Sequence, residues 1–169
     1  VALEVGVSAP QAAGAPRFTE DLLFTHRGLS GPAVLQISTF WRPGAPIEID
    51  LQPDRSLERA WIDERPEPRQ QLSTLLAASL PRRLGLLWLQ RFAAQHPGLR
   101  PETRLAEAGH RALRELAQSL HRWRLQPAGT EGYRKAEVTS GGVATEGLDP
   151  RTMQAQAVPG LYFIGEVVA

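Results

Sequence analysis

The stretch Ile-Glu-Ile-Asp-Leu-Gln, residues 47–52, alternates aliphatic with polar side chains and marks the point where the pattern of the chain changes. An alternation of this kind predicts a strand with one buried face. The same period appears upstream, in residues 2–7 and around residues 18–25. Downstream, from Asp54 to about Gln126, apolar residues recur at the helical period instead. We therefore expect helices that interrupt a β unit.

Three apolar stripes lie within the helical part, and Pro81, Pro97 and Pro101 separate them. The first comprises Leu72, Leu75, Leu76 and Leu80; the second Leu84, Leu87, Trp88 and Phe92; the third Leu105, Ala108, Ala112, Leu113, Leu116 and Leu120. They predict three or four short helices with a small shared core. Upstream, Ser30 and Pro32 predict the N-cap and first turn of a further short helix.

Strand patterns return in residues 122–126 and 133–139, which we interpret as a hairpin with a long turn. The predicted fold class is α+β: a small antiparallel β-barrel-like domain interrupted by an inserted helical subdomain. Residues 1–53 and 122–147 form the barrel-like part, residues 54–121 the helical subdomain, and residues 148–169 a return segment. Short strands between Pro/Gly turns are typical of closed or sharply curved sheets.

The composition is that of an ordinary globular protein, with 169 residues, 42% hydrophobic and 22% charged. A chain of this size buries roughly 70% of its surface, enough for one substantial core. The absence of cysteine excludes disulfides, thiolate nucleophiles and Cys-based metal sites. No apolar run approaches the length of about 20 residues that spans a bilayer. We expect a cytoplasmic protein without a membrane partner.

The formal charge of +1 gives no overall bias towards nucleic acid, and we expect no nucleic-acid partner. Charge is nevertheless unevenly distributed. Residues 54–126 contain 13 arginines and eight acidic residues, whereas the rest of the chain contains six basic and ten acidic residues. The helical part is therefore the one candidate for a basic binding face.

The last twelve residues, Val158 to Ala169, read as a turn followed by an apolar strand. A strand this apolar needs neighbours on both faces, as in a parallel sheet. We therefore expect the chain to be a piece of a larger protein. The first residue, Val1, fits a processed or excised start, since the sole methionine is Met153.

Glycine-rich segments supply the candidate sites. Glycine lets the backbone approach a ligand closely, and consecutive N–H groups can bind an anion or a polarised carbonyl. Each segment by itself is also ordinary turn chemistry. The relevant stretches are Phe24-Thr-His-Arg-Gly-Leu-Ser-Gly-Pro-Ala33, Lys135-Ala-Glu-Val-Thr-Ser-Gly-Gly-Val143, Asp149-Pro-Arg-Thr-Met153 and Pro159-Gly-Leu-Tyr-Phe-Ile-Gly-Glu-Val167.

In this order, the four stretches resemble a bacterial flavoprotein family of NAD(P)/FAD-dependent oxidoreductases, the aminoacetone oxidase-like proteins. The resemblance spans nearly the whole chain, although the helical middle matches loosely. It implies a parent with a Rossmann-like FAD-binding domain, a barrel-like insert and a helical subdomain within that insert. The glycine fingerprint that seats the FAD pyrophosphate in that family is missing here. The chain would be the substrate-side insert, inactive alone.

The resemblance also implies site residues. Thr139, Ser140, Gly141, Gly142 and Val143 would lie near the flavin, and Gly165 and Glu166 near its ribityl or phosphate part. His26, Arg27, Gly28, Leu29, Ser30, Gly31 and Pro32 would face the flavin ring or the substrate. FAD would bind in the full-length parent and not to this chain alone, with NAD(P)H as a further candidate electron donor. The partners would be the missing FAD-binding domain and a small-molecule substrate not yet identified.

Other functions remain open from the residues alone. Ser30 near His26 superficially resembles the nucleophile turn of a hydrolase, but Pro32 stands where that turn needs glycine. The Arg-rich helices, with Arg82-Arg83 and residues 121–124, suit a stand-alone interaction module or a lid over the cofactor. The four histidines are scattered without ligand spacing, so we expect no metal site, and no catalytic acid or base is identified.

Overall fold

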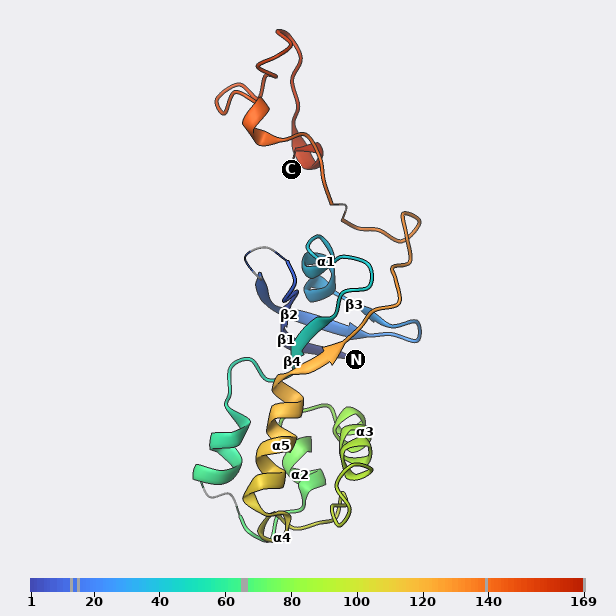
Figure 1. Ribbon diagram of the computed structural model, residues 1–169, viewed down its shortest axis with the longest axis vertical. Coiled ribbons are helices and arrows are strands. Elements are labelled where there is room, and N and C mark those ends of the chain that lie inside the picture. Colours follow the sequence, from blue (N-terminus) through green and yellow to red (C-terminus); the bar gives the residue numbers. More distant parts are fainter. Residues whose placement is uncertain (13, 15, 65–66, 139, 169) are drawn as a thin grey trace. The chain divides into compact units, whose positions relative to one another are not determined.

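A five-stranded antiparallel sheet is the framework of the computed structural model (Figure 1), which describes residues 1–12, 14, 16–64, 67–138 and 140–168. The chain divides into two units, Val1–Thr130 and Glu131–Ala169. The strands are β1 (Ala2–Ser8), β2 (Arg17–Phe24), β3 (Leu29–Ser30), β4 (Ile47–Asp50) and β5 (Trp123–Leu125). Their order across the sheet is β3-β2-β1-β4-β5, and every neighbouring pair is antiparallel.

The pairing of β4 with β5 confirms the predicted insertion. Ile49 faces Trp123 and Ile47 faces Leu125 across this pair, although the whole helical subdomain lies between the two strands in sequence. The sheet is therefore a curled antiparallel half-barrel with helices inserted between two adjacent strands, which confirms the α+β fold class. The alternation in residues 47–50 is also confirmed, because Ile47 and Ile49 are buried and Glu48 and Asp50 are not.

Helix α1 (Pro32–Ser38) begins where predicted, but its N-cap is Gly31 and not Ser30. Ser30 instead pairs with Leu23 in the sheet. Gly31 has φ 92°, and a Cβ at this position would lie 2.7 Å from the carbonyl oxygen of Asp21. Only glycine fits this tight passage from β3 into α1, so the backbone, and not a serine hydroxyl, determines where the helix starts.

The helical subdomain contains four α-helices and a π-helical turn within the part that the structure describes. They are η1 (Arg59–Asp63), α2 (Leu72–Ala77), α3 (Arg82–Ala93), α4 (Leu105–Ala108) and α5 (His110–His121). The first apolar stripe is buried as predicted. The second is shifted, because α3 buries Gly85, Leu89 and Phe92 while Leu87 is 56% exposed. The third is broken at Gly109, where φ of 67° separates α4 from α5.

The helices and the sheet share one core, as the length of the chain allowed, although a small core shared among the helices was predicted. Buried residues of β1, β4, α2 and α5 belong to the same hydrophobic cluster. At the junction, the N–H of Leu51 donates to the carbonyl of Leu120 at 3.0 Å, just beyond the end of β4. Both side chains are completely buried. The helical subdomain is thus packed against the sheet that carries it.

The predicted hairpin between residues 122–126 and 133–139 is wrong. Residues 123–125 pair with β4, and residues 133–135 form a turn in which Lys135 donates its N–H to the Gly132 carbonyl at 3.0 Å. A strand needs a buried face, yet Tyr133 is 91% exposed. Residues 133–138, the described part of the second half of the predicted hairpin, are therefore not a strand, and Thr139 lies outside the described residues.

The second unit contains short 3₁₀ turns, η2 (Thr145–Gly147) and η3 (Gly165–Val167), joined by isolated bridges. The predicted strand over Leu161–Val167 is wrong, since its end is the η3 turn with Gly165 at φ 77°. Its apolar side chains lie at the surface, with Tyr162 57% and Ile164 76% exposed. Without a ladder of partners, this segment does not become a strand.

Candidate functional site

The predicted substrate-side segment begins as the turn of the β2–β3 hairpin. Thr25 organises it: its hydroxyl accepts the N–H groups of Arg27 and Gly28 at 3.2 Å each and donates to the Gly28 carbonyl at 2.9 Å. A main-chain bond from Thr25 to Gly28, 2.8 Å long, closes the turn. The exposed side chains of His26 and Arg27 are therefore carried on the tip of a well-defined hairpin.

The rest of that segment forms part of the sheet and of helix α1. Leu29 and Ser30 form β3, Gly31 is buried at the tight passage and Pro32 opens α1. No hydrogen bond joins His26 to Ser30 within the described ranges, and Ser30 is paired in a strand. The geometry of a hydrolase nucleophile is therefore missing, because the serine does not project from a strand-to-helix turn.

The two segments predicted to contact the cofactor meet in the second unit. The N–H of Val143 donates to the Val167 carbonyl at 2.8 Å, and Val143 bridges Val168 in parallel. This places Ser140, Gly141 and Gly142 in the chain that leads to this contact and Gly165 and Glu166 in the turn before it. Thr139 lies outside the described residues.

The glycines of these segments leave the backbone open. Gly141 has φ 90° and Gly165 φ 77°, and a Cβ on either would meet nothing within 4 Å. Their positive φ angles, and not crowding, favour glycine. An accessible main chain on both sides of the Val143–Val167 hydrogen bond is the feature a flat ligand would need in order to lie against it.

Asp149 stabilises a loop of the second unit. The Asp149 carboxylate accepts the N–H groups of Arg151 at 2.9 Å and Thr152 at 3.0 Å. These two hydrogen bonds stabilise the charged form and hold the pKa of Asp149 below its ordinary value. The carboxylate is thus a turn-forming acceptor within the fourth motif stretch, which explains the sequence Asp-Pro-Arg-Thr without a catalytic role.

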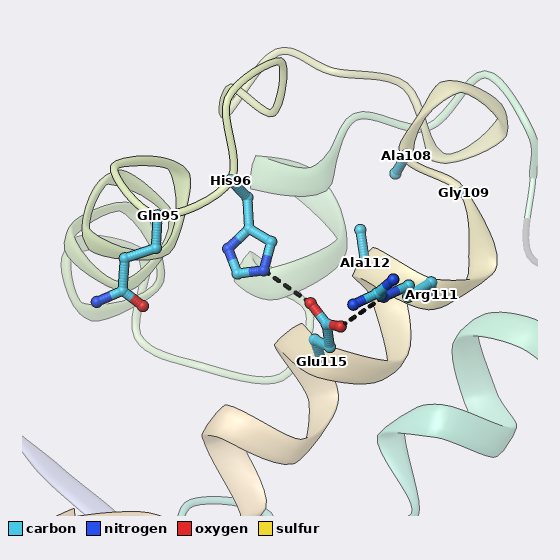
Figure 2. Close-up of a pocket in the computed structure, with 7 residues that line it drawn as sticks. All are labelled: Gln95, His96, Ala108, Gly109, Arg111, Ala112 and Glu115. Atoms are coloured by element: carbon cyan, nitrogen blue, oxygen red, sulfur yellow. Dashed lines mark hydrogen bonds and ion pairs between the residues drawn. The ribbon is translucent and has the colours of Figure 1, made fainter.

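A shallow hollow of about 430 Å³ lies between the end of α3 and the start of α5. The side chains that line it are drawn in Figure 2. His96 contacts Glu115 there, with 2.8 Å between Nε2 and Oε2, and its Nδ1 lies 3.0 Å from the Phe92 carbonyl. Arg111 donates to the other Glu115 oxygen at 2.9 Å. Hydrogen bonds to its carboxylate lower the pKa of Glu115, and the bond from Arg111 has a larger effect than the one from His96.

His96, Arg111 and Glu115 line the hollow and are paired with one another, so their arrangement needs no bound ligand to explain it. Both carboxylate oxygens of Glu115 are engaged, and the His96 ring stacks on Phe92 with the ring centres 3.9 Å apart. The cluster therefore ties the C-terminal end of α3 to α5. We assign it no catalytic role.

A second network crosses from the sheet to the helices. Leu57 N–H donates to His121 Nε2 at 3.1 Å, so the ring proton sits on Nδ1 and is donated to Asp50 at 2.7 Å. Arg17 reaches the other Asp50 oxygen at 2.8 Å. Burial opposes ionisation of Asp50, but the hydrogen bonds from His121, Gln52 and Arg17 outweigh it and lower its pKa.

Neither histidine network was predicted from the sequence. Short ligand spacing between histidines is a local signal, whereas Asp50 and His121 are 71 residues apart and His96 and Glu115 are 19 apart. No local pattern points to such pairs. Among the described residues, no group of three His, Asp or Glu side chains is arranged to hold a metal ion, and no helix is both long and apolar enough to cross a bilayer.

Two features define the architectural class of the protein. It has a curled antiparallel sheet, and a helical subdomain is inserted in sequence between the adjacent strands β4 and β5. The family model described as "HI0933-like protein barrel and H2TH domain" matches residues 1–138. The chain belongs to this family. The description agrees with the observed half-barrel and its inserted helices.

Two curated relatives are similar over nearly all of the chain. Ribosomal RNA dihydrouridine synthase of Escherichia coli (strain K12) is 50% identical over 167 residues, which is 96% of this chain and 40% of that protein. The protein of the same name from Haemophilus influenzae is 43% identical over 152 residues, 89% of this chain and 36% of that protein. The chain therefore spans about two fifths of the length of these relatives.

Proposed function

We propose that the protein containing this chain reduces uridine in ribosomal RNA to dihydrouridine, and that this chain forms the substrate side of the enzyme. The observation that carries the proposal is the 50% identity, over 96% of the chain, to a protein named ribosomal RNA dihydrouridine synthase. A second relative with the same name supports it. Since both relatives are much longer than the chain, the activity is proposed for the whole protein.

The reaction needs a source of two electrons, and we propose FAD for this role. A bound flavin in its reduced form would supply the two electrons as a hydride to the pyrimidine double bond and be oxidised, and a proton would complete the saturation. The residues of the second unit fit the edge of such a site, because Gly141 and Gly165 leave an open main chain on both sides of the Val143–Val167 contact. Ser140, Gly142 and Glu166 would lie along the same edge. The chain has no pyrophosphate-binding fingerprint, so a further FAD-binding domain is the expected partner.

The hairpin turn is the best candidate for contact with the substrate. Its main chain is held by Thr25, so the exposed His26 and Arg27 are presented from a defined position. The His26 imidazole is able to hydrogen-bond a base, and Arg27 is able to bind a phosphate. We propose that these two residues position the target nucleotide.

The proposal sets aside the expectation of no nucleic-acid partner, which rested on a net charge of +1. Overall charge is a weak guide when the charge is segregated, as it is here between the helical subdomain and the remainder of the chain. A cytoplasmic location and NAD(P)H as the reductant of the flavin remain parts of the proposal, since ribosomal RNA is in the cytoplasm and a flavin must be reduced again after each turnover.

The test is complementation. An Escherichia coli strain that lacks its 50%-identical relative is given the full-length protein containing this chain, and dihydrouridine in purified ribosomal RNA is measured by mass spectrometry. We expect the modification to be restored, and the purified protein to carry FAD. A well-expressed, FAD-bearing protein that restores no dihydrouridine would contradict the proposed substrate. A protein without flavin would contradict the proposed cofactor.

A further inference from the structure

The arginines of the helical subdomain fall into two groups. Those near η1 and on α5 are neutralised by carboxylates: Arg55 and Arg59 by Glu64, Arg111 by Glu115 and Arg114 by Glu58. By contrast, Arg82, Arg83 and Arg91 on α3 make no ion pair in the described part of the chain. Among the residues that the structure describes, helix α3 therefore carries three arginines without an ion pair, and it has no acidic residue.

The shape of α3 concentrates this charge on one side. Gly85, Leu89 and Phe92 are buried against the core. At 100° per residue, the side opposite to them carries Arg83, Leu87, Gln90 and Arg91, which are all exposed. We call these four residues the outer face of α3. Arg82 flanks this face in the first turn of the helix.

The surroundings reinforce the positive potential. No acidic residue occurs between Pro68 and Pro101, a stretch that contains five arginines. The Trp88 ring contacts Trp123 edge to face, with the ring centres 5.4 Å apart, and the Trp88 indole N–H donates to Ser119 at 2.9 Å. Arg122 and Arg124 flank Trp123 in sequence and are exposed, but successive side chains of a strand point to opposite faces, so we do not count them with the outer face of α3.

We propose that the outer face of α3 is a docking surface for the sugar-phosphate backbone of the RNA substrate. This inference rests on the proposed function for the identity of the polyanion. Arg83 and Arg91 lie about 12 Å apart along the helix axis, so they contact separate phosphates. Leu87 lies between them, is 56% exposed and packs against a ribose or base. A surface that bound only ions would need no apolar group at this position.

Guanidinium groups without an internal partner also suit this role energetically. Binding of a phosphate does not first require an intramolecular ion pair to break, and released counterions favour the complex at low salt. The arginines of α5 differ, because each would have to leave a carboxylate 2.6–2.9 Å away. The two groups therefore provide matched test and control positions on two helices of 12 residues each.

The experiment measures binding of the full-length protein to protein-free ribosomal RNA from the Escherichia coli strain that lacks the relative, over a range of salt concentrations. The test variant is R83Q/R91Q, and the control is R111Q/R114Q, which removes the same two positive charges. We expect the test variant to bind roughly tenfold more weakly and the slope of log K against log salt to fall by about 1.5. The control should keep the wild-type slope, and R83K/R91K should recover most of the affinity.

Several results would overturn the docking surface. Equal losses in the test and control variants would show that only net charge matters. An unchanged slope in R83Q/R91Q would also do so. Circular dichroism must show that each variant is folded.

Dihydrouridine formation separates this inference from the proposed function. A raised KM for RNA with unchanged kcat in R83Q/R91Q supports the docking surface. Modification by the wild type with an unchanged KM in the variant refutes the surface alone. RNA binding through α3 without any modification would refute the proposed reaction while the surface stands.

Discussion

His121, at the end of α5, donates its Nδ1–H to the carboxylate of Asp50, at the end of β4, across 2.7 Å. The other ring nitrogen accepts the N–H of Leu57, so the imidazole bridges the last residue of the strand and the first segment of the helical subdomain. Asp50 in turn holds Arg17 of β2. The pair therefore fixes the point at which the chain leaves the sheet for the helices.

Replacing Asp50 with alanine should destabilise the protein by about 2 kcal/mol. The substitution leaves the His121 N–H and the Arg17 guanidinium without their acceptor in a part-buried setting. Urea unfolding followed by circular dichroism measures the change. Glu4→Ala, at an exposed position of β1, is the control and should change stability by less than about 0.5 kcal/mol. Equal effects would show that the network contributes nothing.

The Asp50 network also predicts an acid-sensitive stability. Its pKa in the folded protein lies below the ordinary value of 3.8, so its contribution is complete above that pH and is lost as the pH falls through the lower folded-state value. The urea midpoint should therefore drop below about pH 4. In Asp50→Asn this drop should be shallower, since the titrating group is gone. A variant with the wild-type pH profile would exclude Asp50 as a source.

Gly31→Ala should be strongly destabilising, by about 3 kcal/mol. The added Cβ would lie 2.7 Å from the Asp21 carbonyl, and alanine disfavours the φ of 92°. Gly129→Ala is the matched control, because nothing lies within 4 Å of its Cβ position and it should change stability by less than about 0.5 kcal/mol. Thermal unfolding compares the two. Similar midpoints for both variants would show that the chain passes from β3 to α1 by another route.

The shared core predicts a contrast between two leucines of the helical subdomain. Leu120 is completely buried, whereas Leu87 is 56% exposed. Leu120→Ala should lower the free energy of unfolding by about 3 kcal/mol, and Leu87→Ala by less than about 0.5 kcal/mol. Chemical denaturation tests both. Loss of the helical signal alone in Leu120→Ala, with an intact sheet, would argue against one common core.

The 169-residue chain alone should bind FAD far more weakly than the full-length protein. In the proposed site, the open glycines of the second unit would form only one edge for the cofactor, and the chain lacks the pyrophosphate fingerprint. Titration of FAD fluorescence against the chain, beside the full-length protein, measures the difference. Tight stoichiometric binding to the chain would show that it contains a complete site.

Periodicity predicted the parts of the fold that are governed by local burial. The structure confirms both the alternation in residues 47–50 and the buried stripe along α2. The position of α3 was predicted, but its buried face was not, because Leu87 and Leu89 are equally apolar and only the packing decides between them. Periodicity therefore predicted where the helices lie better than it predicted which of their faces is buried.

Two of the failures share a different cause, the need for a partner distant in sequence. Residues 133–138 and 161–167 have the composition of strands, but a strand also needs a neighbour to complete its hydrogen bonds. The prediction for Ser30 failed for a more local reason: the residue is a good N-cap by type, yet pairing with Leu23 across the β2–β3 hairpin engages it in the sheet. A single sequence does not display these pairings.

For the candidate sites, glycine motifs were visible locally and side-chain networks were not. The meeting of residues 140–143 with residues 165–168 is compatible with the order of the motifs, although their role in binding a cofactor stays a prediction. The unpaired state of Arg83 and Arg91 depends on where carboxylates fall in space. That information comes only with the fold.

The adjacency of β4 and β5 fixes how the helical subdomain is attached to the sheet. Neighbouring strands lie about 4.8 Å apart, a gap that a two-residue turn spans. The subdomain therefore leaves the sheet after Asp50 and rejoins it at Trp123, on the neighbouring strand. Because its core is continuous with that of the sheet, deleting the subdomain and closing the gap with a short turn would expose buried side chains such as Leu51 to water.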